Sequence, residues 1–272
     1  MFKTPEPVNP GKHARLKISA APNYRYAATE LVTPFVSGEM WQVAREYVTV
    51  FPLHADALPL AVLGAEVGVN AYVGDGSPGT PAWWGRYVPA HLRRYPFVLA
   101  PRAADAGDAN NDQRFTLCLD AAALQLNEVE GRPLFTADGQ PAELLKEVQQ
   151  ALLGLQQDFA ITQALVQQID QAGLLVAHNL QVNRAGREPV ALSGFRVVDQ
   201  TKLRACAPDV LAELARTRAL DLVYAHIGSL SNLQDGLLAK KAAAQSATAS
   251  SEFNIDSFLA TEGGTFKLDF LQ

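Results

Sequence analysis

Three arginines and four aromatic residues lie close together between residues 83 and 95, and these side chains could recognise a ligand. The arginines are Arg86, Arg93 and Arg94, and the aromatic residues are Trp83, Trp84, Tyr87 and Tyr95. A guanidinium group can hold a carboxylate or a phosphate through two parallel hydrogen bonds, and it can also stack on an aromatic ring. The segment therefore predicts a surface that binds an anion or a peptide.

A structural role would explain the same composition. The aromatic side chains can belong to the core, and the arginines can form ion pairs that fix a short helix between two strands. Replacing Arg93 and Arg94 by Ala separates the two interpretations, because loss of ligand capture at an unchanged melting temperature supports binding and a collapsed fold supports the structural role. An enzyme of unfamiliar type that uses Tyr87, His91, Arg93 and Arg94 is the alternative function, and it predicts a deep pocket where His91 meets an arginine.

The other polar residues show no recognisable catalytic signature. A nucleophilic triad needs a serine or cysteine beside a histidine that a carboxylate orients, and the context of Ser229 lacks the glycine spacing of a nucleophile elbow. The turn at Gly74–Gly79 is not followed by the lysine of a phosphate-binding loop. We therefore expect no catalytic residue, no cofactor and no metal, since the histidines are scattered: His13, His54, His91, His178 and His226.

The composition excludes several classes of protein. A net charge of −5 and a pI of about 5.6 give no basic footprint for nucleic acid. The first residues have no apolar signal-peptide region, and the most apolar stretch, residues 58–73, is interrupted by Pro59 and Gly64. Cys118 and Cys206 lack metal-ligand spacing and fit buried or half-buried thiols. We expect a soluble cytoplasmic protein without a membrane span, whose association with the cell surface would require a partner.

The elements that must position the arginine segment read as a mixed α+β fold. Pro89 suits the first turn of a short helix that ends before Pro96. Runs of β-branched and aromatic residues predict strands, with a mobile loop at residues 103–112 and a hairpin around residues 183–187. The predicted strands cover residues 47–53, 58–64, 70–73, 97–100, 114–120, 174–182 and 190–198.

Residues 141–172 predict one long amphipathic helix, because their apolar positions recur in steps of three and four. Gly173 supplies a natural stop, and the outer face is rich in glutamine, which suits either solvent or a partner. Two or three further helices close the domain with a buried stripe at Leu220, Val223, Ile227, Leu230 and Leu233 or Leu237.

The C-terminal residues divide into a linker and a tail. Residues 242–252 carry too little apolar bulk to pack, so we expect a flexible linker. Residues 253–272 place apolar side chains at alternating positions, and such a peptide docks either as an added strand on its own sheet or on a partner. The domain organisation that follows is an N-terminal arm or edge segment at residues 1–23, a domain at residues 24–241, the linker and the tail.

The segment Trp84–Leu99, with its Tyr-Val-Pro and Arg-Arg-Tyr-Pro-Phe pattern, resembles the most characteristic motif of the bacterial SapC family, which is associated with surface layers. Further matches follow in the family's order at Leu117–Asp120, Gly131–Phe135, Asp138–Pro141, Gly194–Asp199 and Tyr224–Leu230. The family more often has an aromatic residue at the position of His91, and its members commonly end soon after residue 230, so the linker and tail resemble an extension. This SapC is not the peptide-transporter permease of the same name.

The resemblance implies a working partner and attaches no catalytic residues. Family members occur beside genes that resemble flavin-dependent tryptophan halogenases and outer-membrane receptors. From the predicted strands and helices we expect an α+β domain with an antiparallel, strongly bent sheet, packed by the long helix and the C-terminal helices.

The expected function is non-catalytic binding of a protein partner or a small anionic ligand, as an accessory of a surface-layer or nutrient-uptake system. The candidate binding residues are Trp84, Arg86, Tyr87, His91, Arg93, Arg94 and Tyr95.

Overall fold

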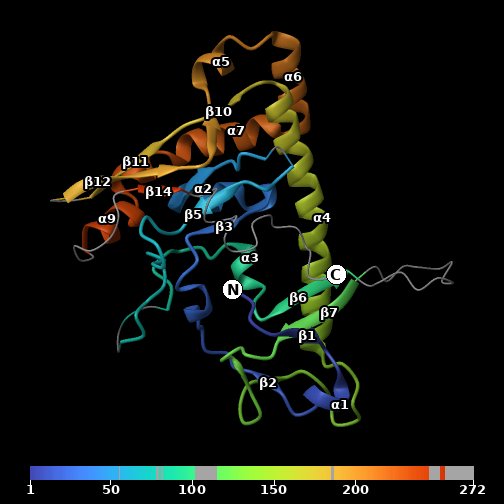
Figure 1. Cartoon of the computed structure of the whole chain (residues 1–272). Coiled ribbons are helices and arrows are strands. Elements are labelled where there is room, and N and C mark those ends of the chain that lie inside the picture. Colours follow the sequence, from blue (N-terminus) through green and yellow to red (C-terminus); the bar gives the residue numbers. More distant parts are fainter. Residues whose placement is uncertain are drawn as a thin grey trace.

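The computed structural model describes residues 1–54, 56–77, 80, 82–101, 115–184, 187–244 and 252–254. The predicted mixed α+β class is confirmed. In place of one bent sheet, the described strands form several small sheets, and nearly all of their pairings are antiparallel. One long helix, α4 (Glu143–Gln171), runs past these sheets from the lower part of the molecule to the C-terminal helices (Figure 1).

Two three-stranded sheets flank the arginine segment. In the upper sheet the central strand β5 pairs with β3 and β4, and all three strands are buried. In the lower sheet the central strand β7 pairs with β6 and with the edge strand β1, so the first residues of the chain form an extended edge segment. The strands are β1 (Pro5–Pro7), β3 (Val32–Pro34), β4 (Val48–Val50), β5 (Leu60–Val62), β6 (Phe97–Pro101) and β7 (Phe115–Asp120).

The buried carboxylate of Asp120 ties the N-terminal segment to β7. It accepts hydrogen bonds from the backbone N–H groups of Lys3 at 2.8 Å and Thr4 at 2.9 Å, and from the hydroxyl of Tyr95 at 3.1 Å. A third small sheet lies beyond it, where β2 (Lys17–Ile18) pairs with β8 (Leu126–Asn127) and β9 (Arg132–Pro133). A short helix, α1 (Pro10–His13), connects β1 to β2.

The helix α4 confirms the long amphipathic helix to within a few residues. It ends at Gln171, and Gly173 stops it, because the φ of 69° at Gly173 permits the Leu174 N–H to donate to the Ile169 carbonyl at 3.3 Å. Its glutamine face is exposed or half-buried, as expected of a solvated face. No helix in the described ranges is both long and apolar enough to cross a membrane.

The helix α4 contributes side chains to two large apolar clusters. Leu144, Leu145 and Leu152 pack with β6 and β7 in the lower cluster. Leu165, Val166 and Ile169 belong to the larger upper cluster, which also holds β3, β4, β5 and the C-terminal helices. The helix is therefore the element that joins the two cores.

The predicted strand at residues 70–73 is wrong, because the side chain of Asn70 holds this segment in a turn. Its amide donates to the Ala27 carbonyl at 2.9 Å and its oxygen accepts from the Tyr72 N–H at 2.9 Å. Only a single bridge forms there, between Val73 and Trp83.

The predicted hairpin consists of four short strands. The strands β11 and β12 pair around the turn, and β10 and β13 pair closer to α4. Five short helices follow within the described residues, where two or three were predicted, and the predicted stripe faces the core, with Val223 fully buried. The bounds are β10 (Leu175–Ala177), β11 (Leu180–Arg184), β12 (Arg187–Ser193), β13 (Arg196–Val198), α5 (Gln200–Arg204), α6 (Pro208–Thr217), α7 (Ala219–Ser229), α8 (Asn232–Asp235) and α9 (Leu237–Ala244).

The C-terminal expectations fall largely outside the described residues. The strand β14 (Glu252–Asn254) pairs with β12 in parallel, next to Ala191–Ser193. Residues 242–244, which were predicted to belong to the linker, form the end of α9, and residue 252 begins β14. The rest of the linker, the rest of the tail and the predicted loop at residues 103–112 are not among the described residues, so they stay predictions. Cys118 is buried and Cys206 is half-buried, and both are free thiols, as predicted.

Candidate binding site

A pocket of about 590 Å³ lies between α4 and the arginine segment, between the lower apolar cluster and a smaller cluster around Val36 and Phe159. One wall is the inner face of α4, and the other comes from the 3-10 helix η2 (Ser37–Glu39), the short helix α3 (Ala90–Arg93) and the start of β6. The volume suits a small molecule. The lining residues are Ile18, Val36, Gly38, Glu39, Tyr87, Ala90, Arg93, Arg94, Tyr95, Phe97, Leu144, Val148, Ala151, Leu152, Gly154, Leu155 and Asp158.

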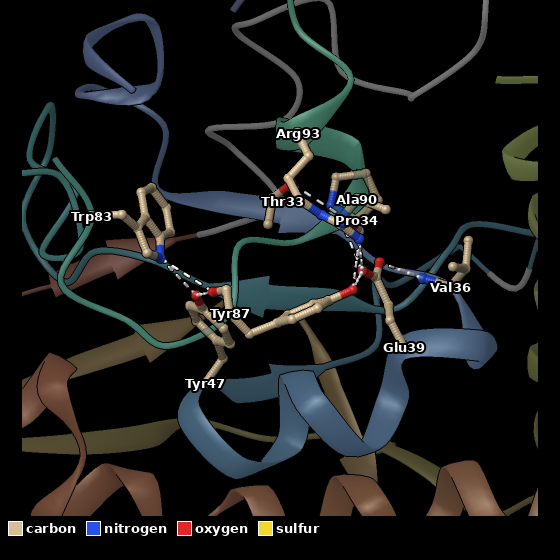
Figure 2. Close-up of polar contacts among 9 residues, drawn as sticks. All are labelled: Thr33, Pro34, Val36, Glu39, Tyr47, Trp83, Tyr87, Ala90 and Arg93. Carbon is tan, nitrogen blue, oxygen red and sulfur yellow. Dashed lines mark hydrogen bonds and ion pairs between the residues drawn. The ribbon is translucent and has the colours of Figure 1, made fainter. Parts of the chain in front are cut away.

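A buried glutamate organises the upper end of this pocket. Glu39 is 5% exposed, and its carboxylate accepts hydrogen bonds from the Tyr87 hydroxyl at 2.6 Å and the Ala90 N–H at 2.8 Å (Figure 2). A third hydrogen bond comes from the Val36 N–H at 3.2 Å. Burial raises the pKa of Glu39, and these hydrogen bonds oppose the rise because they favour the ionised carboxylate.

Arg93 is engaged by this glutamate and by Tyr87. Its guanidinium lies 4.0 Å from the Glu39 carboxylate, donates to the Tyr87 hydroxyl at 2.9 Å and lies over the Tyr87 ring (Figure 2). Burial raises the pKa of Tyr87, and the hydrogen bond to Glu39 raises it further, so the hydroxyl stays protonated and donates. The structural interpretation of the segment therefore holds for Arg93.

Arg94 meets a different environment. It lines the pocket, lies over the Phe2 ring at 5.5 Å, and approaches His91 Nε2 at 3.4 Å. Its buried Nε has no hydrogen-bond partner, and no carboxylate in the described part of the chain pairs with it. Burial alone lowers the pKa of Arg94 to about 10, so the group remains a cation at neutral pH. It is a desolvated positive charge at the wall of an apolar pocket.

Tyr95 lines the pocket but is held by other contacts. Its ring stacks on Tyr26, with centroids 3.9 Å apart, and its hydroxyl donates to Asp120. The Tyr26 hydroxyl donates to the Leu92 carbonyl at 2.8 Å. Tyr95 therefore fixes α3 and the start of β6 against the N-terminal segment, which sets the position of Arg94.

The three remaining candidate residues lie outside the lining. Trp84 is 41% exposed and Arg86 is exposed, with its backbone N–H donating to Glu46 at 2.6 Å. His91 is 7% exposed and packs beside Phe159, with ring centroids 6.3 Å apart. Burial, and then the charge of Arg94, lower the pKa of His91 well below its usual value. His91 thus meets Arg94 at 3.4 Å but is not itself among the pocket-lining residues.

Trp83, another aromatic residue of the segment, also has a structural role. Trp83 is buried and donates from its indole N–H to the Tyr47 hydroxyl at 3.0 Å and the Tyr87 carbonyl at 3.2 Å (Figure 2). Tyr47 also donates to this carbonyl. Trp83 therefore belongs to the core, and it anchors the backbone just before the pocket residues begin.

Sequence reasoning missed most of the pocket. Of the lining residues only Tyr87, Arg93, Arg94 and Tyr95 were candidates, and α4 was predicted as a packing helix without a site on its face. Gly154 lies within the continuous helix α4 at an exposed position, where a Cβ atom would meet nothing within 4 Å. A glycine costs stability inside a helix, but the open space does not require one, so Gly154 by itself does not mark the site.

A second buried polar cluster surrounds His226. Its Nδ1 donates to the Thr49 carbonyl at 2.9 Å and its Nε2 accepts from the Val198 N–H at 3.2 Å. Ser229 donates to the His226 carbonyl at 2.7 Å. Both ring nitrogens are thus occupied by backbone groups in the core. Among the described residues, no three His, Cys, Asp or Glu side chains are placed to hold a metal ion.

Comparison with known proteins identifies a family. The family model described as SapC matches residues 8–235, which include every pocket residue. No curated protein and no solved structure matches the chain.

Proposed function

The chain belongs to the SapC family, and on the geometry of its pocket we propose that it is a non-catalytic binding protein that captures a small anionic ligand beside Arg94. The observation that carries this proposal is the state of Arg94, a half-buried cation that lines the pocket with its Nε unpartnered.

The energetics favour an anion at this position. Lowering the pKa of Arg94 from 12.5 to about 10 corresponds to a cost of about 3 kcal/mol for keeping the charge in the protein. A ligand carboxylate that pairs with the guanidinium would recover part of that cost through charge-assisted hydrogen bonds. Arg93 cannot serve equally, because Glu39 and Tyr87 already engage it.

A binding function agrees with the arrangement of the other polar groups. Glu39, Tyr87 and Arg93 satisfy one another, and Tyr95 is committed to Asp120, so these groups shape the pocket wall. The wider role, as an accessory of a surface-layer or nutrient-uptake system with a halogenase-like or receptor partner, extends the proposal on the family resemblance alone.

The proposal is tested by the paired variants Arg94→Gln and Arg86→Gln. Both remove one positive charge from the same segment, but Arg86 lies outside the pocket. Binding of small organic monoanions to the full chain is screened by ligand-observed NMR and quantified by calorimetry. We expect Arg94→Gln to weaken binding by about tenfold to a hundredfold, the range of a lost charge-assisted contact, and Arg86→Gln to leave it unchanged.

Two controls complete this test. The melting temperature of Arg94→Gln should equal or exceed that of the parent protein, because the substitution removes an unpaired desolvated charge. The ligand should be recovered chemically unchanged after long incubation, as measured by mass spectrometry. Equal losses of affinity in both variants, or conversion of the ligand, would overturn the proposal.

A further inference from the structure

The pocket is elongated, and its lower part is apolar. The α4 residues that line it run from Leu144 to Asp158, a span of about 21 Å along the helix axis. Below Arg94 the walls are hydrocarbon, contributed by Ile18, Phe97 and Val148 together with the nearby leucines of α4. A ligand that fills this section must therefore present an extended apolar body.

Small residues line both walls of the pocket. On α4 these are Ala151 and Gly154, and on the opposite wall Ala90 lies beside Glu39 at the upper end. The space beside Gly154 is open, since an added Cβ atom would have no neighbour within 4 Å. Small residues here keep the channel continuous between the charged upper end and the apolar lower end.

The charged residues that line the pocket can bind one negatively charged group of a ligand. Two carboxylates, Glu39 and Asp158, stand at the upper end, and Arg93 is paired with the first of them. Arg94 is the cation that no described carboxylate pairs with. A second negative charge on the ligand would therefore meet repulsion from the carboxylates without a further cation to bind.

From this arrangement we infer that the ligand is a free, straight-chain aliphatic monocarboxylate, with its carboxylate on Arg94 and its chain along α4 toward Leu144. The inference rests on the proposed function and specifies the chemical class of the ligand. The carboxylate supplies the missing partner of the guanidinium, and the chain removes apolar surface from water in the lower section.

The test is calorimetric titration of the full chain with hexanoate, octanoate and decanoate below their micelle concentrations. Each added methylene should tighten binding by up to about fourfold, the factor expected for one buried methylene. Decanol should bind at least tenfold more weakly than decanoate, because it carries no charge for Arg94. Decanedioate should also bind at least tenfold more weakly, because its second carboxylate has no cation to meet.

A matched pair of variants locates the site. In Gly154→Leu a large side chain is added at a residue that lines the channel, and it should abolish decanoate binding without lowering the melting temperature. In Ala160→Leu the same side chain is added at an exposed position of α4 outside the lining, and binding should stay within about threefold of the parent protein.

The outcomes separate the inference from the proposed function. If acetate or benzoate binds as tightly as decanoate and Arg94→Gln removes that binding, the proposed function stands and the aliphatic class is wrong. If decanoate binds Gly154→Leu as tightly as the parent protein, the location along α4 is wrong. If no organic anion binds at all, the proposed function itself fails.

Discussion

Arg93 and Arg94 are adjacent in the chain, yet they occupy electrostatically opposite situations. Successive side chains at the end of a helical turn point in directions about 100° apart. Arg93 consequently points to Glu39 and Tyr87 and keeps half of its side chain in solvent, with 52% exposed. Arg94 turns inward beneath Phe2, where its charge is desolvated. One residue therefore stabilises the wall and the other remains available to a ligand.

His226 illustrates a titratable group used for structure. Its neutral ring bridges the backbones of Thr49 and Val198, and protonation would abolish the acceptor at Nε2. Burial lowers the pKa of His226 to about 4 in the folded protein. The unfolded chain, with an ordinary histidine pKa of about 6.5, takes up the proton first as the pH falls.

Stability should therefore decrease with acidity over a defined window. We expect His226 to reduce the free energy of unfolding by about 3 kcal/mol between pH 6.5 and pH 4, with no further loss from this group below pH 4. Urea denaturation at a series of pH values measures the effect.

The control for this prediction is His226→Gln, which cannot titrate. The variant should be less stable at pH 7 but should show a flatter dependence on pH. His91 remains in both proteins, so the difference between the two curves isolates His226. Parallel curves would show that His226 is not the group responsible.

At the scale of elements, α4 serves two cores and leaves an opening between them. Its first half packs on β6 and β7, and its second half packs on the upper cluster. Between them Leu155 and Phe159 pack with Val36 and Leu58 in a smaller third cluster, and the pocket opens along this part of the helix. Gly154 lines the pocket there at an exposed position. Glycine thus lowers the local stability of α4 at a position that lines the pocket.

The cost of this opening can be measured with Gly154→Ala. Alanine removes the entropic penalty of glycine within a helix and meets no neighbour, so we expect stability to rise by about 1 kcal/mol. Thermal or urea denaturation provides the measurement.

Gly64→Ala is the contrasting substitution. A Cβ atom at Gly64 would lie 2.1 Å from the Val69 carbonyl oxygen and 2.7 Å from Leu31, so this change should destabilise the protein by about 2 kcal/mol or more. If both variants shift stability in the same direction, the explanation from local space is incorrect.

At the scale of the whole molecule, the C-terminal tail bears on the question of a partner. The strand β14 continues the β11–β12 sheet, so at least residues 252–254 pair within the chain itself. This arrangement covers an edge of β12 that would otherwise be available to another strand. The docking of the remaining tail, and a partner held by it, stay predictions.

Deleting residues 252–272 should expose this edge without unfolding the protein. We expect the amides of β12 that face β14, within Ala191–Ser193, to exchange hydrogen with solvent at least tenfold faster, because they lose their backbone partners. The amides of the buried strand β5 should be unaffected. Hydrogen exchange followed by mass spectrometry distinguishes the two regions, and unchanged protection of β12 would contradict the pairing.

Local pattern alone determined much of this protein, because periodicity and turn chemistry act over a few residues. The α+β class, the helix α4 with its stop at Gly173, and the arginine and aromatic cluster all followed from such patterns. The tertiary structure alone decided which members of that cluster form a site. Three distant parts of the chain contribute Glu39, Arg94 and the face of α4 around Gly154. These residues form one pocket only because the tertiary packing brings them together. A similar long-range contact, from Asn70 to Ala27, helps turn an expected strand into a loop.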